Sequence, residues 1–186
     1  MLNLFKRKST APEPAVRVLL VCMGNICRSP MAEGVLRHRL GGRELPLPVV
    51  VDSAGTHGYH EGAPPDPRAQ AAAQRRGIDI SGLRARRVTP ADFEQFDLVV
   101  AMDDENRTAL LALAAEEHHG KVRLLLEFAT EPPLRSVPDP YYGGALGFER
   151  VLDLVEEAMN GLLDELTAIA ARRQAALAAP PPATGD

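Results

Sequence analysis

A cysteine and an arginine lie six positions apart in the segment C-M-G-N-I-C-R-S-P, which occupies residues 22–30. A cysteine thiolate is a strong nucleophile, and the planar guanidinium of arginine can hold two oxygens of a phosphate group at once. The spacing alone is weak evidence, because arginine is common in this chain. If the two side chains converge, Cys22 can attack a phosphate ester while Arg28 binds its oxygens.

This segment lies between two predicted elements. The apolar run V-R-V-L-L-V at 16–21 predicts a buried strand, and a helical pattern begins with Ser29, the expected cap, and Pro30. Between them, Gly24 and Asn25 tolerate positive φ and let the chain turn tightly. Such a turn can direct successive N–H groups at one anion, and the N-terminal end of the helix adds positive potential. The loop is therefore predicted to bind a phosphate dianion and to favour a thiolate at its floor.

The rest of the chain alternates between short apolar runs and helical patterns. Predicted strands lie at 16–21, 48–52, 97–102 and 121–126. Cap and proline pairs at 66–67 and 89–90 predict helix starts, and apolar residues recur at helical spacing from 148 to 169. This alternation predicts an α/β fold, a three-layer α/β/α sandwich with a four-stranded parallel sheet, doubly wound, with the phosphate-binding loop after strand 1. The ligand site is expected at the carboxyl ends of the strands.

Composition and length indicate the number of domains, the kind of partner and the cellular location. A length of 186 residues suits one domain, expected at 16–172, with flexible tails at 1–15 and 173–186. The formal net charge of -4 gives no reason to expect nucleic acid as a partner. The two cysteines provide no disulfide framework, and no apolar run is long enough for a signal peptide or a membrane span. These features predict a cytoplasmic protein and leave its oligomeric state open.

Ester cleavage also requires a proton donor for the leaving oxygen. The candidate is Asp139, which lies in V-P-D-P-Y-Y-G-G at 137–144, where flanking prolines stiffen the backbone. This segment follows the fourth predicted strand, so it can reach the same sheet edge as the cysteine. All three tyrosines lie in loops that follow predicted strands: Tyr59, Tyr141 and Tyr142. They can line a slot deep enough for phosphotyrosine or, alternatively, be ordinary surface residues of turns.

Five motifs then carry a family resemblance, in this order: C-M-G-N-I-C-R-S-P-M-A-E after the first strand, D-S-A-G-T at 52–56, P-P-D-P-R-A at 64–69, F-D-L-V-V-A-M-D at 96–103 and D-P-Y-Y-G at 139–143. Over about residues 16–170 the chain thereby resembles the low-molecular-weight protein tyrosine phosphatases. The resemblance implies hydrolysis of phosphotyrosine monoesters through a phosphocysteine intermediate, with no metal or other cofactor. It implies that Cys22 is the nucleophile, Arg28 binds phosphate, and Asp139 is general acid and then general base.

The resemblance also implies roles for the surrounding residues. Asn25, Ser29 and Ser53 shape the loop, and Ser29 can also donate a hydrogen bond to the departing sulfur. Cys27 can trap oxidised Cys22 as a disulfide, although a small buried apolar filler describes it equally well. The substrate-binding set is the rest of the loop with the tyrosines: Met23, Gly24, Asn25, Ile26, Cys27, Ser29, Tyr59, Tyr141 and Tyr142.

One position departs from the family pattern. Members often have a histidine in the stretch corresponding to 81–87, where it supports the loop asparagine, and this chain has none there. What supports Asn25 is therefore left open. We expect the departure to affect rate or stability rather than the type of reaction.

Three competing functions remain open at this point. A same-fold arsenate reductase would need additional distal cysteines, which the chain lacks. A phosphoarginine phosphatase resembles the family but carries a smaller polar residue in place of Ile26. A non-catalytic phosphate-binding or redox-sensing module would have no need of Asp139. The expected partners are phosphotyrosine-containing proteins, and bacterial relatives often oppose autophosphorylating tyrosine kinases.

Overall fold

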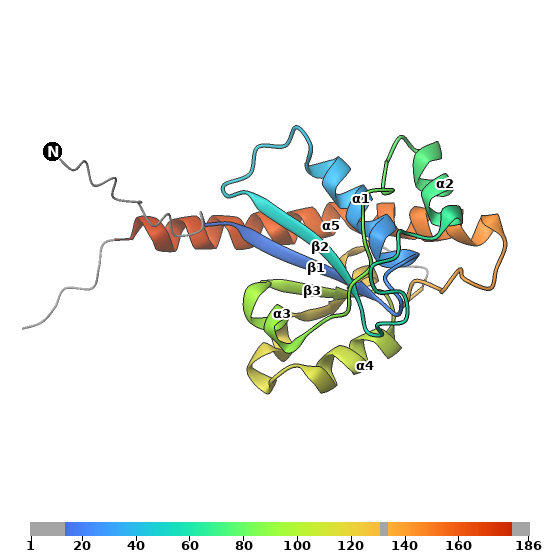
Figure 1. The fold of residues 1–186 in the computed structure, drawn as a ribbon. Coiled ribbons are helices and arrows are strands. Elements are labelled where there is room, and N and C mark those ends of the chain that lie inside the picture. The colour runs from blue at the N-terminus through green and yellow to red at the C-terminus, as the bar shows by residue number, and fades with distance from the viewer. Residues whose placement is uncertain (1–13, 131–133, 180–186) are drawn as a thin grey trace, which may run out of the picture.

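A computed structural model describes residues 14–130 and 134–179 of the chain. Its sheet contains four parallel strands in the order β2-β1-β3-β4, as Figure 1 shows. The strands are β1 (Val16–Cys22), β2 (Val49–Gly55), β3 (Leu98–Ala101) and β4 (Val122–Leu124). Each strand overlaps one of the apolar runs, so the predicted parallel α/β fold is confirmed.

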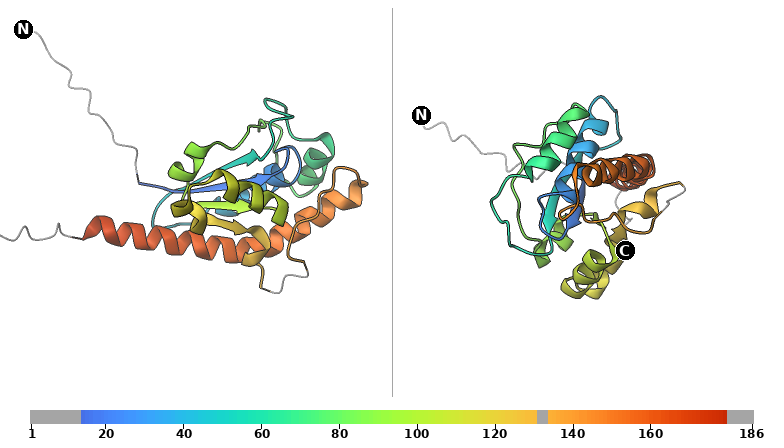
Figure 2. Two further views of the ribbon diagram at one scale, coloured as in Figure 1. Left: turned by 90° about the horizontal axis from the view of Figure 1, so that it is seen from below. Right: turned by 90° about the vertical axis from the view of Figure 1, so that its right-hand side faces the viewer.

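Helices cover both faces of this sheet. They are α1 (Arg28–Leu40), α2 (Pro67–Arg75), α3 (Pro90–Gln95), α4 (Asp104–Leu113) and α5 (Ala145–Ala178), with two short 3-10 helices, η1 (Glu116–Lys121) and η2 (Leu125–Phe128). One apolar cluster joins α1, α2 and α5 to one face, and a second joins α3 and α4 to the other. Figure 2 shows the sheet between these two groups of helices. The predicted three-layer arrangement is therefore present.

The central strand β1 explains why the sequence is apolar without interruption there. Val18 and Leu20 pack in the cluster with α1 and α5, whereas Leu19 and Val21 pack in the cluster with α3 and α4. A strand covered on both faces has to be apolar at consecutive positions. Because β1 lies between β2 and β3, its last residue, Cys22, stands where the strand order reverses, which is the usual ligand position in such sheets.

Two of the three predicted helix starts are confirmed. Asp66 caps α2, because its carboxylate accepts a hydrogen bond of 2.8 Å from the backbone nitrogen of Arg68. Thr89 stands directly before Pro90 at the start of α3. In both places proline occupies the first helical position, where its missing N–H has no cost.

The third predicted start, at Ser29, is wrong. Helix α1 begins at Arg28, preceded by Cys27, so Ser29 lies inside the first turn. Its hydroxyl contacts Cys22 and Asn25 and is therefore not available to cap the helix. Cys27 makes no side-chain cap hydrogen bond.

The predicted end of the domain, at residue 172, lies inside α5, which ends at Ala178. Arg173 donates a hydrogen bond of 3.0 Å to Asp97 Oδ2 and so ties this part of the helix to the residue before β3. Residues 1–13 of the predicted N-terminal tail and 180–186 of the C-terminal tail lie outside the described residues.

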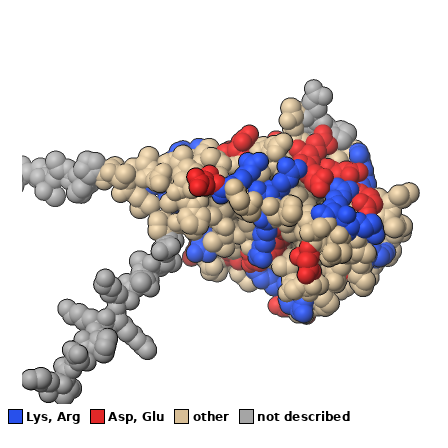
Figure 3. All heavy atoms as spheres, turned by 90° about the horizontal axis from the view of Figure 1, so that it is seen from above, with Lys and Arg blue, Asp and Glu red and all other residues tan. Residues whose placement is uncertain are grey.

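The described surface carries both signs of charge. On the face seen in Figure 3, basic and acidic side chains lie side by side. Arg76, for example, contacts Glu149, Asp153 and Glu156 at 3.1, 2.7 and 3.0 Å. These pairs tie the end of α2 to α5. Within the described ranges, no helix combines the length and apolar character needed to cross a membrane.

Candidate active site

Loops from distant parts of the chain meet at the carboxyl edge of the sheet. They include residues 22–29, which we call the cysteine loop, and residues 137–144, which we call the aspartate loop. Together they line a cavity of about 280 Å³. Its lining residues are Cys22, Met23, Gly24, Ile26, Cys27, Arg28, Tyr59, His60, Asp139, Tyr141 and Tyr142. The residues expected to carry the chemistry thus share one cavity.

The cysteine loop is held against the end of β2. Thr56 N donates to Cys22 O at 2.9 Å, and His57 N donates to Met23 O at 2.9 Å. Gly55 makes this approach possible, because a Cβ at that position would lie 2.7 Å from Met23 O. The glycine of the motif D-S-A-G-T therefore allows the two segments to pack backbone against backbone.

Cys22 lies at the floor of the cavity, 2% exposed, with Sγ 3.1 Å from Ser29 Oγ. Ser29 Oγ also accepts a hydrogen bond of 2.9 Å from Asn25 Nδ2. The hydroxyl hydrogen of Ser29 is therefore free to point elsewhere, and its other neighbouring acceptor, Ala54 O, is farther away at 3.4 Å. Ser29 is thus placed to donate a hydrogen bond to the sulfur of Cys22.

Asn25 is the centre of a directional chain of hydrogen bonds. Its φ of 56° is positive, and of the two loop residues expected to tolerate such a value it is the one that adopts it. Arg86 N donates to Asn25 Oδ1 at 2.9 Å, and this contact sets the orientation of the side-chain amide. Asn25 Nδ2 then donates both of its hydrogens to hydroxyls, of Ser29 at 2.9 Å and of Ser53 at 2.9 Å. Asn25 therefore joins the other two residues expected to shape the loop, Ser29 and Ser53.

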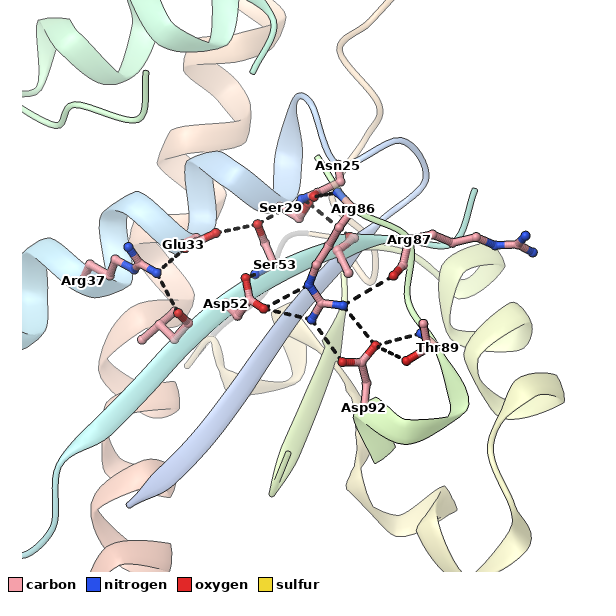
Figure 4. Close-up of polar contacts among 12 residues, drawn as sticks. Asn25, Ser29, Glu33, Arg37, Asp52, Ser53, Arg86, Arg87, Thr89 and Asp92 are labelled. Atoms are coloured by element: carbon pink, nitrogen blue, oxygen red, sulfur yellow. Dashed lines mark hydrogen bonds and ion pairs between the residues drawn. The ribbon is translucent and has the colours of Figure 1, made fainter. Parts of the chain in front are cut away.

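This series of hydrogen bonds ends at the buried carboxylate of Glu33, as Figure 4 shows. Ser53 accepts a hydrogen from Asn25 and donates its own to Glu33 Oε2 at 2.5 Å. Glu33 is 2% exposed and pairs with Arg37, one turn farther along α1, at 2.6 Å. Burial raises the pKa of the Glu33 carboxyl above its ordinary value, although Ser53 and Arg37 oppose the shift. Sequence reasoning missed Glu33, because an acidic residue in a helix is normally at the surface.

The stretch 81–87, which lacks the histidine of the family pattern, supports Asn25 through its backbone. The Arg86 side chain fixes that backbone, since it donates to Asp52 Oδ2 at 2.8 Å and to Asp92 Oδ2 at 3.1 Å (Figure 4). Every residue except proline carries a backbone N–H, so no residue type marks this support in the sequence. The open question about Asn25 thus has a structural answer.

Arg28 is buried at the cavity, 2% exposed. Its Nη1 donates to Asp103 Oδ2 at 2.5 Å and to Val137 O at 3.0 Å, and its Nη2 donates to Asp139 Oδ2 at 3.2 Å. Burial alone would lower the pKa of Arg28, but the negative charges of Cys22, Asp103 and Asp139 outweigh it and raise the pKa. Arg28 is therefore a permanent cation aimed by three groups from distant parts of the chain.

Asp103 is a site residue that sequence reasoning missed. It lies just after β3 and caps α4, where its Oδ1 accepts a hydrogen bond of 2.7 Å from Asn106 N. Its other oxygen holds Arg28. Its position in the sequence could have identified it, because an acidic residue directly after the third predicted strand lies at the same sheet edge as the cysteine.

Asp139 stands at the mouth of the cavity with its side chain 43% exposed. Its Oδ1 accepts a hydrogen bond of 3.1 Å from Tyr141 N, and its Oδ2 faces Arg28. One carboxylate oxygen is thus held by the loop's own backbone. The other points to the cation at the cavity.

Aromatic rings from two loops line the mouth. The rings of Tyr141 and Tyr142 meet edge to face with centroids 5.0 Å apart, and Tyr59 comes from the loop after β2. His60 lines the same cavity and packs on Gly24, where an added Cβ would lie 3.0 Å from the ring. Sequence reasoning missed His60, since a single loop histidine has no distinguishing pattern.

The fold and cavity define a doubly wound α/β protein with a cysteine and an arginine in an anion-binding loop after its first strand. Residues 17–174 match the family model "Low molecular weight phosphotyrosine protein phosphatase". A low molecular weight protein-tyrosine-phosphatase of Streptomyces coelicolor is 47% identical over an alignment of 152 residues, and the match covers 79% of this chain and 91% of that protein.

Solved structures agree with this match. The crystal structure of YfkJ from Bacillus subtilis superposes with a TM-score of 0.78 at 36% identity, covering 86% of this chain and 99% of that one. A protein tyrosine phosphatase from Entamoeba histolytica, with Hepes in its active site, gives a TM-score of 0.74 at 39% identity, covering 81% and 96%. The chain belongs to the low molecular weight phosphotyrosine protein phosphatase family, which is a family of hydrolases.

Proposed function

We propose that this protein hydrolyses phosphotyrosine monoesters in proteins through a phosphocysteine intermediate. Cys22 is the nucleophile, Arg28 binds the phosphate, and Asp139 is the general acid and then the general base. The observation that carries the proposal is that all three line one cavity, with Arg28 3.2 Å from Asp139. The names of the relatives supply the class of substrate.

In the first step the Cys22 thiolate attacks phosphorus, so an S–P bond forms while the bond from phosphorus to the tyrosine oxygen breaks. Asp139 transfers its proton to that oxygen, and tyrosine leaves neutral. Arg28 holds two of the remaining phosphate oxygens. Oδ1 of Asp139 accepts the Tyr141 N–H and Oδ2 accepts from Arg28, so Oδ2 becomes free to carry the proton when phosphate takes its place on Arg28.

In the second step water attacks phosphorus, the S–P bond breaks and inorganic phosphate is released. Asp139, now a carboxylate, accepts a proton from the water. Ser29 Oγ lies 3.1 Å from Sγ and stabilises the departing thiolate by a hydrogen bond. Asn25 and Ser53 keep that hydroxyl in place.

The lining of the cavity supports phosphotyrosine over phosphoarginine and phosphoserine. Met23 and Ile26 present apolar surface, and three tyrosine rings are available to pack on an aryl group: Tyr59, Tyr141 and Tyr142. A phosphoarginine guanidinium would meet the apolar side chain of Ile26 instead of a polar partner. A shorter phosphoserine would leave the rings without contact.

Arsenate reduction and phosphate binding without catalysis have less support. Arsenate reduction would require a distal cysteine to pass a disulfide on, and the chain's two cysteines both lie in the cysteine loop. A non-catalytic phosphate-binding module would not require Asp139 at the mouth. Both cysteines are free thiols, which suits the cytoplasm, where we place this protein and where a tyrosine kinase is the expected partner.

Cys27 has a second role in this proposal, as a resolving thiol. If a peroxide oxidises Cys22 to the sulfenic acid, the Cys27 sulfur can attack it, forming a disulfide with loss of water. Burial, with a smaller effect from the charge of Asp66, raises the pKa of Cys27 to about 12. The Cys27 thiolate is therefore scarce at neutral pH, so Cys27 is a weak nucleophile toward external reagents.

A substrate panel tests the proposal. The purified protein should hydrolyse phosphotyrosine peptides faster than phosphoserine or phosphoarginine peptides, and it should not reduce arsenate with a thiol reductant. Cys22→Ser should abolish turnover, and Asp139→Ala should slow it by roughly 10²- to 10⁴-fold, the usual span for general acid catalysis. Full activity in Cys22→Ser would exclude the covalent mechanism.

A further inference from the structure

Arg68, at the start of α2, is exposed at the surface, yet its guanidinium contacts Asp66, the aspartate loop and the ring of Phe148. Its Nε and Nη2 donate to the two oxygens of Asp66 at 3.0 and 2.8 Å. Its Nη1 donates to Tyr141 O at 3.0 Å and to Gly143 O at 3.4 Å. The guanidinium also lies over the ring of buried Phe148, with its central carbon 4.8 Å from the ring centroid.

These contacts connect the two loops of the candidate site. Asp66, which holds Arg68, donates its own backbone N–H to Ile26 O in the cysteine loop at 2.8 Å. On its other side Arg68 holds two carbonyl oxygens of the aspartate loop. The turn at 65–68 is therefore a link between the loop that would bind phosphate and the loop that carries the acid. Figure 1 shows α2 beside the beginning of α5, where the aspartate loop ends.

The link reaches Asp139 through one residue. Tyr141 N donates to Asp139 Oδ1 at 3.1 Å, while Tyr141 O accepts from Arg68. Tyr141 is therefore held on both sides, with one contact to the acid and the other to the arginine. Arg68 also lies 5.5 Å from the centroid of the Tyr141 ring, which restricts that side chain as well. Without Arg68, the backbone that orients the exposed carboxyl of Asp139 would lose its attachment to α2.

We propose that Arg68 is a positioning residue for Asp139: through Tyr141 it holds the aspartate loop so that the acid stays aligned above the cysteine loop. This inference rests on the proposed role of Asp139 as general acid. Arg68 does not line the cavity, so it acts through the loop and not on the substrate. Lysine cannot replace it fully, because one ammonium group cannot bind the Asp66 carboxylate with two parallel bonds and the Tyr141 carbonyl at once.

The test uses the leaving group of the substrate. General acid catalysis matters most for esters of weakly acidic phenols, because their oxygen must be protonated as it departs. Arg68→Met should therefore lower kcat/KM for phenyl phosphate about tenfold more than for 4-nitrophenyl phosphate. Arg68→Lys should give a smaller difference. The control is Arg75→Met on the same helix, since Arg75 pairs with Glu149 of α5 at 2.5 Å and, among the described residues, makes no hydrogen bond to the aspartate loop.

A double variant shows whether Arg68 acts through the acid. In an Asp139→Ala background, Arg68→Met should change kcat/KM by less than about twofold, because two residues that act as one unit are not additive. An equal loss for both esters in the single variant, or a full additional loss in the double variant, would overturn the proposal and leave Arg68 a merely structural residue.

Amide hydrogen exchange gives a readout that does not depend on catalysis. Exchange in residues 139–144 should be faster in Arg68→Met than in the wild type and unchanged in Arg75→Met. Unchanged exchange in Arg68→Met overturns the link itself. If the wild type instead fails to hydrolyse any aryl phosphate while exchange responds as expected, the proposed function is wrong although the Arg68 link exists, so the two failures are distinguishable.

Discussion

The hydroxyl oxygen of Ser29 lies 3.1 Å from Cys22 Sγ and 2.9 Å from Asn25 Nδ2. Because Asn25 donates to that oxygen, the serine hydrogen is free to point to the sulfur, which lies closer than the other acceptor, Ala54 O at 3.4 Å. The contact stabilises a thiolate more than a sulfur that is bonded to phosphorus. Ser29 therefore favours breakdown of the proposed intermediate.

Ser29→Ala should slow the second step. A hydrogen bond to a charged group contributes about 1.5 to 3 kcal/mol, so kcat should fall by roughly 10- to 100-fold. Rapid mixing with 4-nitrophenyl phosphate should then show a burst of nitrophenol of about one equivalent, as a phosphocysteine accumulates. A lower kcat without any burst would assign the effect of Ser29 to the first step instead.

Asp103→Ala should destabilise the folded protein by about 2 kcal/mol, because the change removes a helix cap and one partner of buried Arg28. Phosphate can compensate the charge of Arg28, so added phosphate should raise the melting temperature more in the variant than in the wild type. Asp103→Asn is the matched control. It keeps an oxygen for Asn106 N but loses the charge and the acceptor for Arg28, so it retains the cap and should be less destabilising than the alanine variant. Equal effects of the two substitutions on unfolding would contradict a contribution from the cap.

Glu33→Gln should alter how stability depends on pH. Burial raises the pKa of Glu33 in the folded protein above its ordinary value of 4.5. The folded state then binds this proton more tightly than the unfolded state does, so the contribution to stability is complete below that ordinary value and is lost as the pH rises through the folded pKa. Glutamine does not titrate. The free energy of unfolding of the variant, relative to wild type, should therefore increase with pH across this window.

Urea unfolding at several pH values between about 4 and 8 measures this difference. Glu44→Gln, at an exposed position, serves as the control. A difference between wild type and Glu33→Gln that stays constant with pH would show that Glu33 does not titrate in the folded protein as expected.

Cys27 should resist alkylation at neutral pH. Burial raises its pKa to about 12, so its thiolate is scarce, while Cys22 opens into the cavity. Iodoacetamide should therefore label Cys22 alone in the folded protein, and both cysteines once urea has unfolded it. Peptide mass spectrometry gives the site of labelling. Comparable labelling of both thiols in the folded protein would contradict the predicted inertness of Cys27.

The elements that place Cys22 and Arg28 were predictable because their signals are local. An uninterrupted apolar run such as 16–21 has few solutions other than a strand covered on both faces. A cysteine directly after it, followed by residues that tolerate positive φ and then a helix, places the loop at the sheet edge where ligands bind. Asp139 could be named for a related reason, since the parallel topology brings the segment after the fourth run to the same edge.

The contacts that orient these residues were not predictable in the same way. Arg28 meets Asp103 across 75 positions of sequence, and Arg86 N meets Asn25 across 61. One of these contacts uses a backbone group that every non-proline residue has, and the other uses an acid that also serves as an ordinary helix cap. The start of α1 was mispredicted for the same reason, because the Ser29 hydroxyl is taken by neighbours that a local pattern does not reveal.

By itself, then, the sequence determined the parallel sheet, the cysteine loop and the identity of the three residues proposed for the chemistry. Only the tertiary structure decided which residues support them. Ser29 lies beside the sulfur of Cys22, Glu33 stands at the end of a buried hydrogen-bond chain, and Arg68 holds the loop that carries Asp139. The physical reason is that apolar periodicity and turn preferences act over a few residues. The direction of a hydrogen bond depends on which distant group the folded chain brings within about 3 Å.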